Sequence, residues 1–171
     1  MRRRIYLGLG GNLGDRRALL VAALRAVQSM EEVELTAYSS VYETPPWGIE
    51  EQPAFYNMVA CIETEFAPVE VLHRMQRIET ALGRVRDIHW GPRTMDIDLL
   101  CMEGGETVKT EELQLPHPYL LDRAFVLVPL AEIAPTLVLG AETIENHAAR
   151  LPDVAHVVRV DRIAIMELGK H

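Results

Sequence analysis

Cysteine is scarce in this sequence: its 171 residues contain only Cys61 and Cys101, each inside an apolar stretch that is typical of a strand. Two isolated cysteines in such stretches favour small buried side chains over a disulfide framework or a cysteine metal site. Long apolar runs are missing as well, so no segment is expected to cross a membrane, and the amino-terminal stretch lacks the apolar core of a signal peptide. We therefore expect a cytoplasmic protein with no membrane partner.

Basic residues are in deficit. Lys and Arg number 17 against 25 Asp and Glu, which gives a formal net charge of −8. Nucleic acids and anionic membranes attract basic surfaces, so neither is expected as a partner. Six of the arginines surround one segment, which predicts a local cationic site on an acidic protein. Those arginines are Arg74, Arg77, Arg84, Arg86, Arg93 and Arg123.

Internal repeats and low-complexity segments are also absent, and an apolar fraction of 49% fits one domain spanning residues 1–171. The pattern gives, in order, strand, helix, strand, strand, helix and strand. The ranges are 4–10, 15–30, 34–44, 54–66, 68–82 and a strand from 96 on. This order predicts an α+β protein with a ferredoxin-like β-α-β-β-α-β core, its helices on one face of an antiparallel sheet and the other face left for loops and ligands. A mixed C-terminal extension, with a short helix near 143–150, carries no function that we can assign.

The segment from Trp90 to Leu100 is the most informative one. Gly91-Pro92 ends a polar stretch, and an apolar alternation starts just after it. In an extended strand Asp96 and Asp98 project from one face, while the apolar residues between and beside them project from the other. Those apolar residues are Met95, Ile97 and Leu99.

Two neighbouring carboxylates suit Mg²⁺, which binds oxygen ligands, keeps several waters and shares its shell with substrate phosphates. A guanidinium at Arg93, three residues ahead of the pair, is suited to phosphate oxygens. The competing interpretation is a solvated Asp-x-Asp on an exposed sheet face. We favour the metal site, because the apolar run that follows, Leu99 to Cys101, indicates a central strand, where paired charges need a reason.

Three other positions have two interpretations each. Trp47 lies in the proline-rich loop 45–53, either displayed for function or folded back on the core. Asn57 interrupts an apolar strand face, so its amide either binds a heterocycle or satisfies a neighbouring loop. His117 is held between two prolines, which makes it a ligand candidate, although a lone histidine is usually structural.

Two polar patterns favour a purely structural interpretation when taken alone. The glycines between Gly8 and Gly14 match no phosphate-binding fingerprint and indicate a tight strand-to-helix turn. Gln76 and Glu79 lie three apart on the polar side of the second helix, where such residues are mostly solvated.

Taken together, these segments resemble the 6-hydroxymethyl-7,8-dihydropterin pyrophosphokinase family over about residues 5–135. The most specific match is the Trp-Gly-Pro-Arg…Asp-x-Asp segment, which is the signature of that family. The other matching segments are Gly8-Leu-Gly-Gly-Asn-Leu-Gly14, Tyr42-Glu-Thr-Pro-Pro-Trp-Gly48, Gln52-Pro-Ala-Phe-Tyr-Asn57, Gln76-Arg-Ile-Glu79, Gly83-Arg-Val-Arg86, and Pro116-His117 with Arg123 and Phe125.

The resemblance implies a ferredoxin-like, Mg-dependent diphosphotransferase of folate biosynthesis. Such an enzyme transfers the terminal diphosphate of ATP to the hydroxymethyl oxygen of a dihydropterin and releases AMP. The implied cofactor is Mg²⁺, two ions with ATP, and the implied partners are ATP and the dihydropterin. A monomer is expected.

The resemblance also assigns roles to individual residues. It implies that Asp96 and Asp98 hold the metal ions and that Arg84, Arg93 and Asp98 are catalytic. The implied pterin-binding residues are Thr44, Pro45, Trp47, Phe55, Asn57, Trp90 and Phe125. The implied ATP-binding residues are Gln76, Glu79, Arg84, Arg86, Trp90, Arg93, Leu99, His117 and Arg123.

The sequence departs from the family pattern at several positions. Gly11 stands where Ser is common, and Trp47 replaces an aliphatic side chain at the loop tip, so the pterin contact there is expected to differ. Tyr119 and Leu121 stand where many members carry Arg and His, which weakens the positive charge on the nucleotide side.

Two alternatives belong to other functional classes. One is a non-catalytic ferredoxin-like module that binds a nucleotide or metabolite and regulates a partner. The other is a protein-interaction domain that uses Trp47 and Trp90 as exposed anchors. The presence of both aspartates together with Arg84 and Arg93 favours the enzyme.

Overall fold

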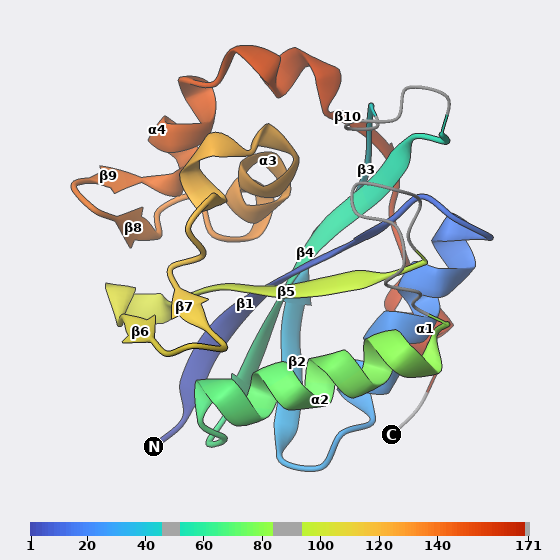
Figure 1. Ribbon diagram of the computed structural model, residues 1–171. Coiled ribbons are helices and arrows are strands. Elements are labelled where there is room, and N and C mark those ends of the chain that lie inside the picture. The colour runs from blue at the N-terminus through green and yellow to red at the C-terminus, as the bar shows by residue number, and fades with distance from the viewer. Residues whose placement is uncertain (46–51, 84–93, 170–171) are drawn as a thin grey trace.

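The computed structural model describes residues 1–45, 52–83 and 94–169. Its main sheet has six strands in the order β10-β3-β4-β1-β5, and β2 also pairs with β4. All of these pairings are antiparallel. The strands are β1 (Arg3–Gly11), β2 (Val33–Tyr38), β3 (Val41–Thr44), β4 (Phe55–Thr64), β5 (Asp96–Met102) and β10 (Val158–Asp161). The helices are α1 (Arg16–Gln28), α2 (Pro68–Ala81), α3 (Ala124–Ile133) and α4 (Ile144–Ala149) (Figure 1).

The ferredoxin-like core is confirmed, with α1 following β1 and α2 connecting β4 to β5. Two short hairpins lie outside this core: β6 (Val108–Lys109) with β7 (Gln114–Leu115), and β8 (Val138–Leu139) with β9 (Glu142–Thr143). Short 3-10 turns cover 103–105, 120–122, 152–156 and 165–168. Among the described residues, no helix has the length and apolarity that a membrane span requires.

The helices of the core begin and end where the sequence predicts. Asp15 caps α1, because its carboxylate accepts a hydrogen bond from the Ala18 backbone at 3.0 Å. Pro68 occupies the first turn of α2, where its missing N–H costs nothing. Gly83 follows the helix with a φ of 86°, a conformation that favours glycine.

One expectation is wrong: the strand predicted over 34–44 is two strands, β2 and β3, separated by Ser39 and Ser40. Both serines are buried, and their hydrogen bonds involve side chains as well as backbone. The Ser39 hydroxyl accepts from the Val59 backbone at 2.9 Å. The backbone N–H and the hydroxyl of Ser40 both donate to the Glu132 carboxylate on α3 at 2.9 Å. These bonds bend the chain between the two strands.

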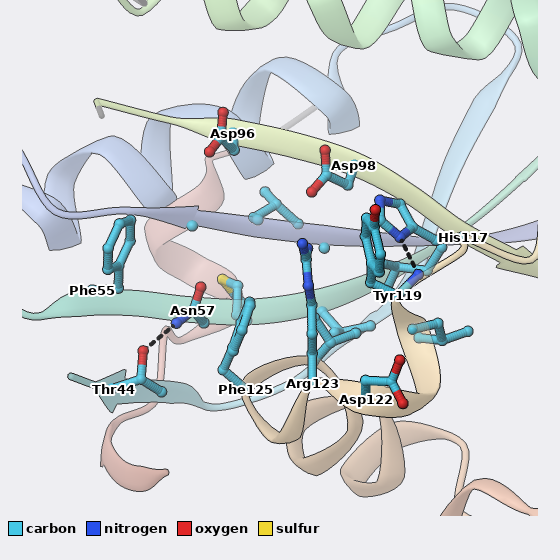
Figure 2. A pocket seen from close by; sticks show the side chains of 18 residues that line it. Thr44, Phe55, Asn57, Asp96, Asp98, His117, Tyr119, Asp122, Arg123 and Phe125 are labelled. Carbon is cyan, nitrogen blue, oxygen red and sulfur yellow. Dashed lines mark hydrogen bonds between the residues drawn. The ribbon is translucent and has the colours of Figure 1, made fainter. Parts of the chain in front are cut away.

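The two faces of the sheet are covered by different helices. Helices α1 and α2 pack on one face, called here the α1–α2 face, and α3 and α4 pack on part of the other, called the α3 face (Figure 1). The expectation that the second face stays free of helices is therefore wrong. Its apolar half is covered by α3 and α4, with Cys61 and Cys101 buried there as free thiols. The other half holds a cavity (Figure 2).

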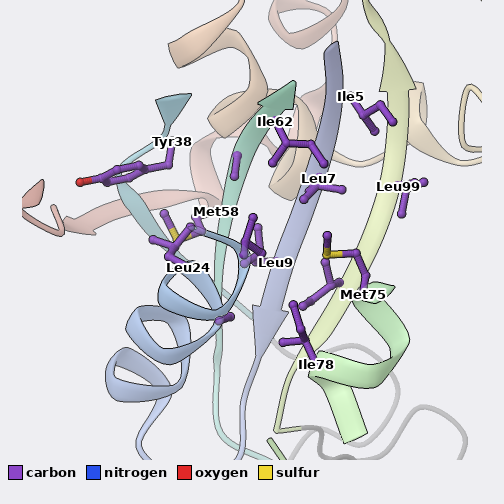
Figure 3. Close-up of a cluster of buried hydrophobic side chains, with 14 of the residues drawn as sticks. Ile5, Leu7, Leu9, Leu24, Tyr38, Met58, Ile62, Met75, Ile78 and Leu99 are labelled. Carbon is purple, nitrogen blue, oxygen red and sulfur yellow. The ribbon is translucent and has the colours of Figure 1, made fainter. Parts of the chain in front are cut away.

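The α1–α2 face carries the main apolar core (Figure 3). Alternate residues of β1 and β5 point into it, and they meet Leu24 of α1 and Met75 of α2. Full burial of one such side chain contributes about 1.5–3 kcal/mol. The alternate residues are Ile5, Leu7 and Leu9 on β1 and Ile97 and Leu99 on β5, none of them more than 3% exposed. This core fixes which face of β5 its aspartates occupy.

The C-terminal extension is part of the fold. Strand β10 pairs with β3 at the edge of the sheet, and Ile163 is fully buried in the α1–α2 core. The Tyr38 hydroxyl donates to the Ile163 carbonyl at 2.9 Å. Arg17 of α1 pairs with Glu167 at 2.7 Å and also with Asp161. The extension therefore links the edge strand to α1.

Candidate functional site

A cavity of about 790 Å³ lies on the α3 face. Its floor is formed by β4, β1 and β5, and its wall is formed by the start of α3 and the segment leading to it (Figure 2). Its polar and aromatic lining residues are Thr44, Phe55, Asn57, Asp96, Asp98, His117, Tyr119, Asp122, Arg123 and Phe125.

The register of the sheet orders the floor into two rows. Gly10 lies between Asn57 and Asp96, and Gly8 lies between Val59 and Asp98. A Cβ atom added at Gly10 would be 2.3 Å from Asn57 Oδ1, so only glycine fits there. Gly8 and Gly10 belong to β1, where glycine marks a close approach, and not to the strand-to-helix turn expected for the glycines between Gly8 and Gly14. The sequence feature that could have revealed this is the spacing of two residues between Gly8 and Gly10, which puts both on one face of a strand.

One end of the cavity combines two aromatic rings with a buried amide. Phe55 and Asn57 come from β4, Phe125 comes from α3, and Thr44 comes from the last position of β3 (Figure 2). Asn57 Nδ2 donates to Thr44 Oγ1 at 2.8 Å, and both residues are buried. This bond fixes the plane of the amide. Pro45 follows Thr44 directly but is exposed and does not line the cavity.

Asp96 and Asp98 lie on one face of β5, as the alternation predicts, and both line the cavity. The expectation that their strand is central is wrong, because β5 is the last strand in the order of the main sheet, next to β1. Asp98 is exposed and Asp96 is half-buried. In Figure 2 both carboxylates point from β5 into the space above the floor.

Leu99, which the resemblance assigns to ATP binding, does not reach this cavity with its side chain. It is 2% exposed and packs in the core on the opposite face. Leu100 lines the cavity instead, because it lies two and four residues after Asp98 and Asp96 and therefore shares their face of β5.

The other end of the cavity holds a histidine and an arginine. His117 Nδ1 accepts from the Tyr119 backbone at 3.2 Å, and the His117 backbone donates to the Leu100 carbonyl at 2.7 Å. Burial lowers the pKa of His117, a nearby Asp98 raises it and Arg123 lowers it, with a net lowering from 6.5. A neutral ring that accepts at Nδ1 carries its proton on Nε2.

Arg123 is held between two rings. Its guanidinium carbon lies 5.1 Å from the centre of the Tyr119 ring and 5.6 Å from that of Phe125. In Figure 2 its side chain extends from the start of α3 toward the floor, between these rings. Such cation–π contacts restrict an arginine while leaving its N–H groups available for an anion. Tyr119 departs from the family pattern, but its ring helps to orient the Arg123 guanidinium.

Gln76 and Glu79 lie on α2, beneath the opposite face, and do not line the cavity. Glu79 is 4% exposed, so the expected solvated position is wrong for it. Its carboxylate accepts from the Ile97 backbone at 2.7 Å, which anchors β5 between the two aspartates. The remaining predicted residues, Trp47, Arg84, Arg86, Trp90 and Arg93, lie outside the described residues.

The donor set of the cavity fits Mg²⁺. The described residues contain no cluster of three or more His, Cys, Asp or Glu side chains that would form a complete protein cage. Mg²⁺ does not require one, because it is commonly bound by one or two carboxylates together with waters and substrate phosphates. Asp96 and Asp98, two residues apart and facing one cavity, supply this arrangement.

Comparisons with known proteins identify the family of this chain. The family model described as 7,8-dihydro-6-hydroxymethylpterin-pyrophosphokinase (HPPK) matches residues 6–135. The 2-amino-4-hydroxy-6-hydroxymethyldihydropteridine pyrophosphokinase of Methylorubrum extorquens is 48% identical over 158 residues, covering 92% of this chain and 99% of that one. The protein of the same name from Pseudomonas aeruginosa is 41% identical, with 92% and 89% covered.

Among solved structures, Plasmodium falciparum HPPK-DHPS with pteroate matches with a TM-score of 0.70 and 16% identity. The match covers 88% of this chain and 42% of that longer chain, and at this identity it supports the fold alone. The family model and the relatives of 48% and 41% identity show the family as well as the fold. The chain belongs to the 7,8-dihydro-6-hydroxymethylpterin-pyrophosphokinase family, diphosphokinases of folate biosynthesis.

Proposed function

We propose that this chain transfers the terminal diphosphate of ATP to the hydroxymethyl oxygen of 6-hydroxymethyl-7,8-dihydropterin, and that the transfer takes place in the cavity on the α3 face. The observation that carries the proposal is the order of groups in that cavity. An amide flanked by aromatic rings lies at one end, a carboxylate pair lies along β5, and a histidine and an arginine lie at the other end.

The aromatic end suits the pterin. Phe55 and Phe125 offer ring faces to a flat heterocycle, for which stacking is favourable. The Asn57 amide, oriented by Thr44, offers both a donor and an acceptor to the amide-like edge of the pterin. Pro45, Trp47 and Trp90 remain part of the proposed pterin contacts through their family motif.

The carboxylates of Asp96 and Asp98 would hold two Mg²⁺ ions. When bound, these ions would supply positive charge that neutralises the charge developing on the phosphate groups during transfer. In the transfer, the bond from the α,β-bridging oxygen to the β-phosphorus breaks, and this oxygen leaves as part of AMP. A new bond forms from the β-phosphorus to the hydroxymethyl oxygen of the pterin. We propose that Asp98 accepts the hydroxyl proton and that Arg84 and Arg93 neutralise charge on the transferred group.

The other end suits the nucleotide. A neutral His117 donates from Nε2, and the oriented guanidinium of Arg123 binds phosphate oxygens. Arg86 joins them through its family motif. Glu79 acts indirectly in this proposal, because its bond to the Ile97 backbone fixes the strand that carries both aspartates. Gln76 and Leu99 are proposed to bind ATP through their family positions, outside this cavity.

Product analysis tests the reaction. The protein is incubated with Mg-ATP, with and without 6-hydroxymethyl-7,8-dihydropterin, and the nucleotide products are separated. We expect AMP that depends on the pterin. ADP as the product would mean transfer of a single phosphoryl group, and nucleotide binding without turnover would favour the non-catalytic regulatory module.

A further inference from the structure

Arg16, the first residue of α1, contacts β3 and the start of β4, the strands that carry Thr44, Phe55 and Asn57 of the proposed pterin site. It lies on the α1–α2 side of the sheet, opposite the cavity, and does not line it. Its Nη1 donates to the Ala54 carbonyl at 2.8 Å and lies 3.4 Å from the Glu43 carboxylate. Its guanidinium carbon is 4.0 Å from the centre of the Tyr56 ring.

These three partners alternate with cavity residues along the same strands. Glu43 on β3 pairs with Tyr56 on β4, and the next rung pairs Thr44 with Phe55. Because side chains alternate between faces, a group that holds Glu43 and Tyr56 on one face fixes the backbone that presents Thr44 and Phe55 on the other. Arg16 therefore contacts both strands at the rung that precedes the Thr44–Phe55 pair.

The chemistry of these contacts favours a fixed geometry. A guanidinium is planar, and it can donate in its plane while its face stacks on an aromatic ring. Arg16 is only partly exposed, at 27% of its side chain, so its contacts are less screened than those of a surface ion pair. A lysine would keep the charge but would lose the planar stacking.

We propose that Arg16 is a positioning residue for the pterin, acting through β3 and β4 on Thr44, Phe55 and Asn57. The inference rests on the proposed assignment of this end of the cavity to the pterin. It predicts an effect on the pterin alone, because the described contacts of Arg16 are with Glu43, Ala54 and Tyr56, away from the histidine end of the cavity.

The test compares Arg16→Ala with Arg25→Ala, which removes the same charge from an exposed position further along the same helix. Equilibrium binding of the pterin is measured by fluorescence at saturating Mg²⁺ and a non-hydrolysable ATP analogue, and steady-state kinetics give KM for ATP. We expect Arg16→Ala to weaken pterin binding about tenfold, an effect of the size expected for losing a partly buried charge-assisted hydrogen bond. Arg25→Ala should match the wild type, and KM for ATP should stay the same in both.

Arg16→Lys keeps the test decisive if Arg16→Ala does not fold. We expect it to weaken pterin binding less than Arg16→Ala does, with KM for ATP unchanged. Wild-type pterin affinity in the folded variants, or an equal loss of pterin and ATP affinity, would overturn the role of Arg16. A wild-type protein that forms no AMP with the pterin would instead refute the proposed function.

Discussion

Asn57 on β4 donates its side-chain amide to the hydroxyl of Thr44 on β3 at 2.8 Å, inside the aromatic end of the cavity. Replacing Thr44 with Val removes the acceptor and leaves a buried amide hydrogen unpaired, at a cost of about 1–3 kcal/mol. We expect Thr44→Val to weaken pterin binding by about tenfold or more in a fluorescence titration. Thr44→Ser retains the hydroxyl and should bind nearly as the wild type does. Equal affinity in Thr44→Val and wild type would show that this bond does not orient the amide.

A second prediction concerns the glycines of the cavity floor. A methyl group at Gly10 would lie 2.3 Å from Asn57 Oδ1 and 3.2 Å from the Tyr56 carbonyl, whereas one at Gly8 would meet the flexible Leu100 side chain at 3.2 Å. Gly10→Ala should therefore displace Asn57 and lose most of its pterin affinity. Gly8→Ala should lose less. Equal losses in equilibrium binding would mean that the crowding at Asn57 is not what Gly10 prevents.

Acid should destabilise the protein through His117. Burial is the main cause that lowers its pKa below 6.5, so on acidification the unfolded chain takes up the proton before the folded one does. Its contribution to stability is present above about pH 6.5 and declines as the pH falls below that value. Urea unfolding from about pH 5 to 8 should show this loss in the wild type and a weaker one in His117→Gln. A wild type that gains stability relative to His117→Gln in acid would contradict the assigned shift.

The C-terminal extension should matter for stability through one residue. Ile163 is fully buried in the α1–α2 core, whereas Ile165, two positions later, is 78% exposed. Ile163→Ala should lower the free energy of unfolding by about 2–5 kcal/mol. Ile165→Ala should change it by less than about 0.5 kcal/mol. Similar unfolding midpoints for the two variants would mean that the extension does not belong to the cooperative fold.

The parts of the fold that depend on local pattern were predictable. The alternation along β5 places Asp96 and Asp98 on one face and Leu99 on the other, as a period of two requires. Helix α1 begins after its Asp15 cap and buries the expected apolar stripe. The candidate site was predictable mainly because several ordered motifs resemble one family, since spacing alone also allowed a solvated Asp-x-Asp.

The parts that depend on distant partners were not predictable. The break between β2 and β3 requires Glu132, which lies 92 residues after Ser40. The burial of Glu79 depends on a backbone N–H of the next strand, and the position of β5 at the edge of the sheet depends on the order of all the strands. The extension shows weak periodicity because buried residues such as Ile163 are isolated between exposed ones and form no regular apolar stripe.

The most direct test of the account is the loss of the Asp98 carboxylate. AMP formation from Mg-ATP and 6-hydroxymethyl-7,8-dihydropterin is compared in the wild type, in Asp98→Ala and in Glu106→Ala, which removes an exposed carboxylate beyond the other end of β5. Asp98→Ala should fold normally and lose about a thousandfold in turnover, the order expected when a group that organises charge is removed from a phosphoryl-transfer site. Glu106→Ala should keep wild-type turnover. A folded Asp98→Ala with near-wild-type AMP formation would contradict the account.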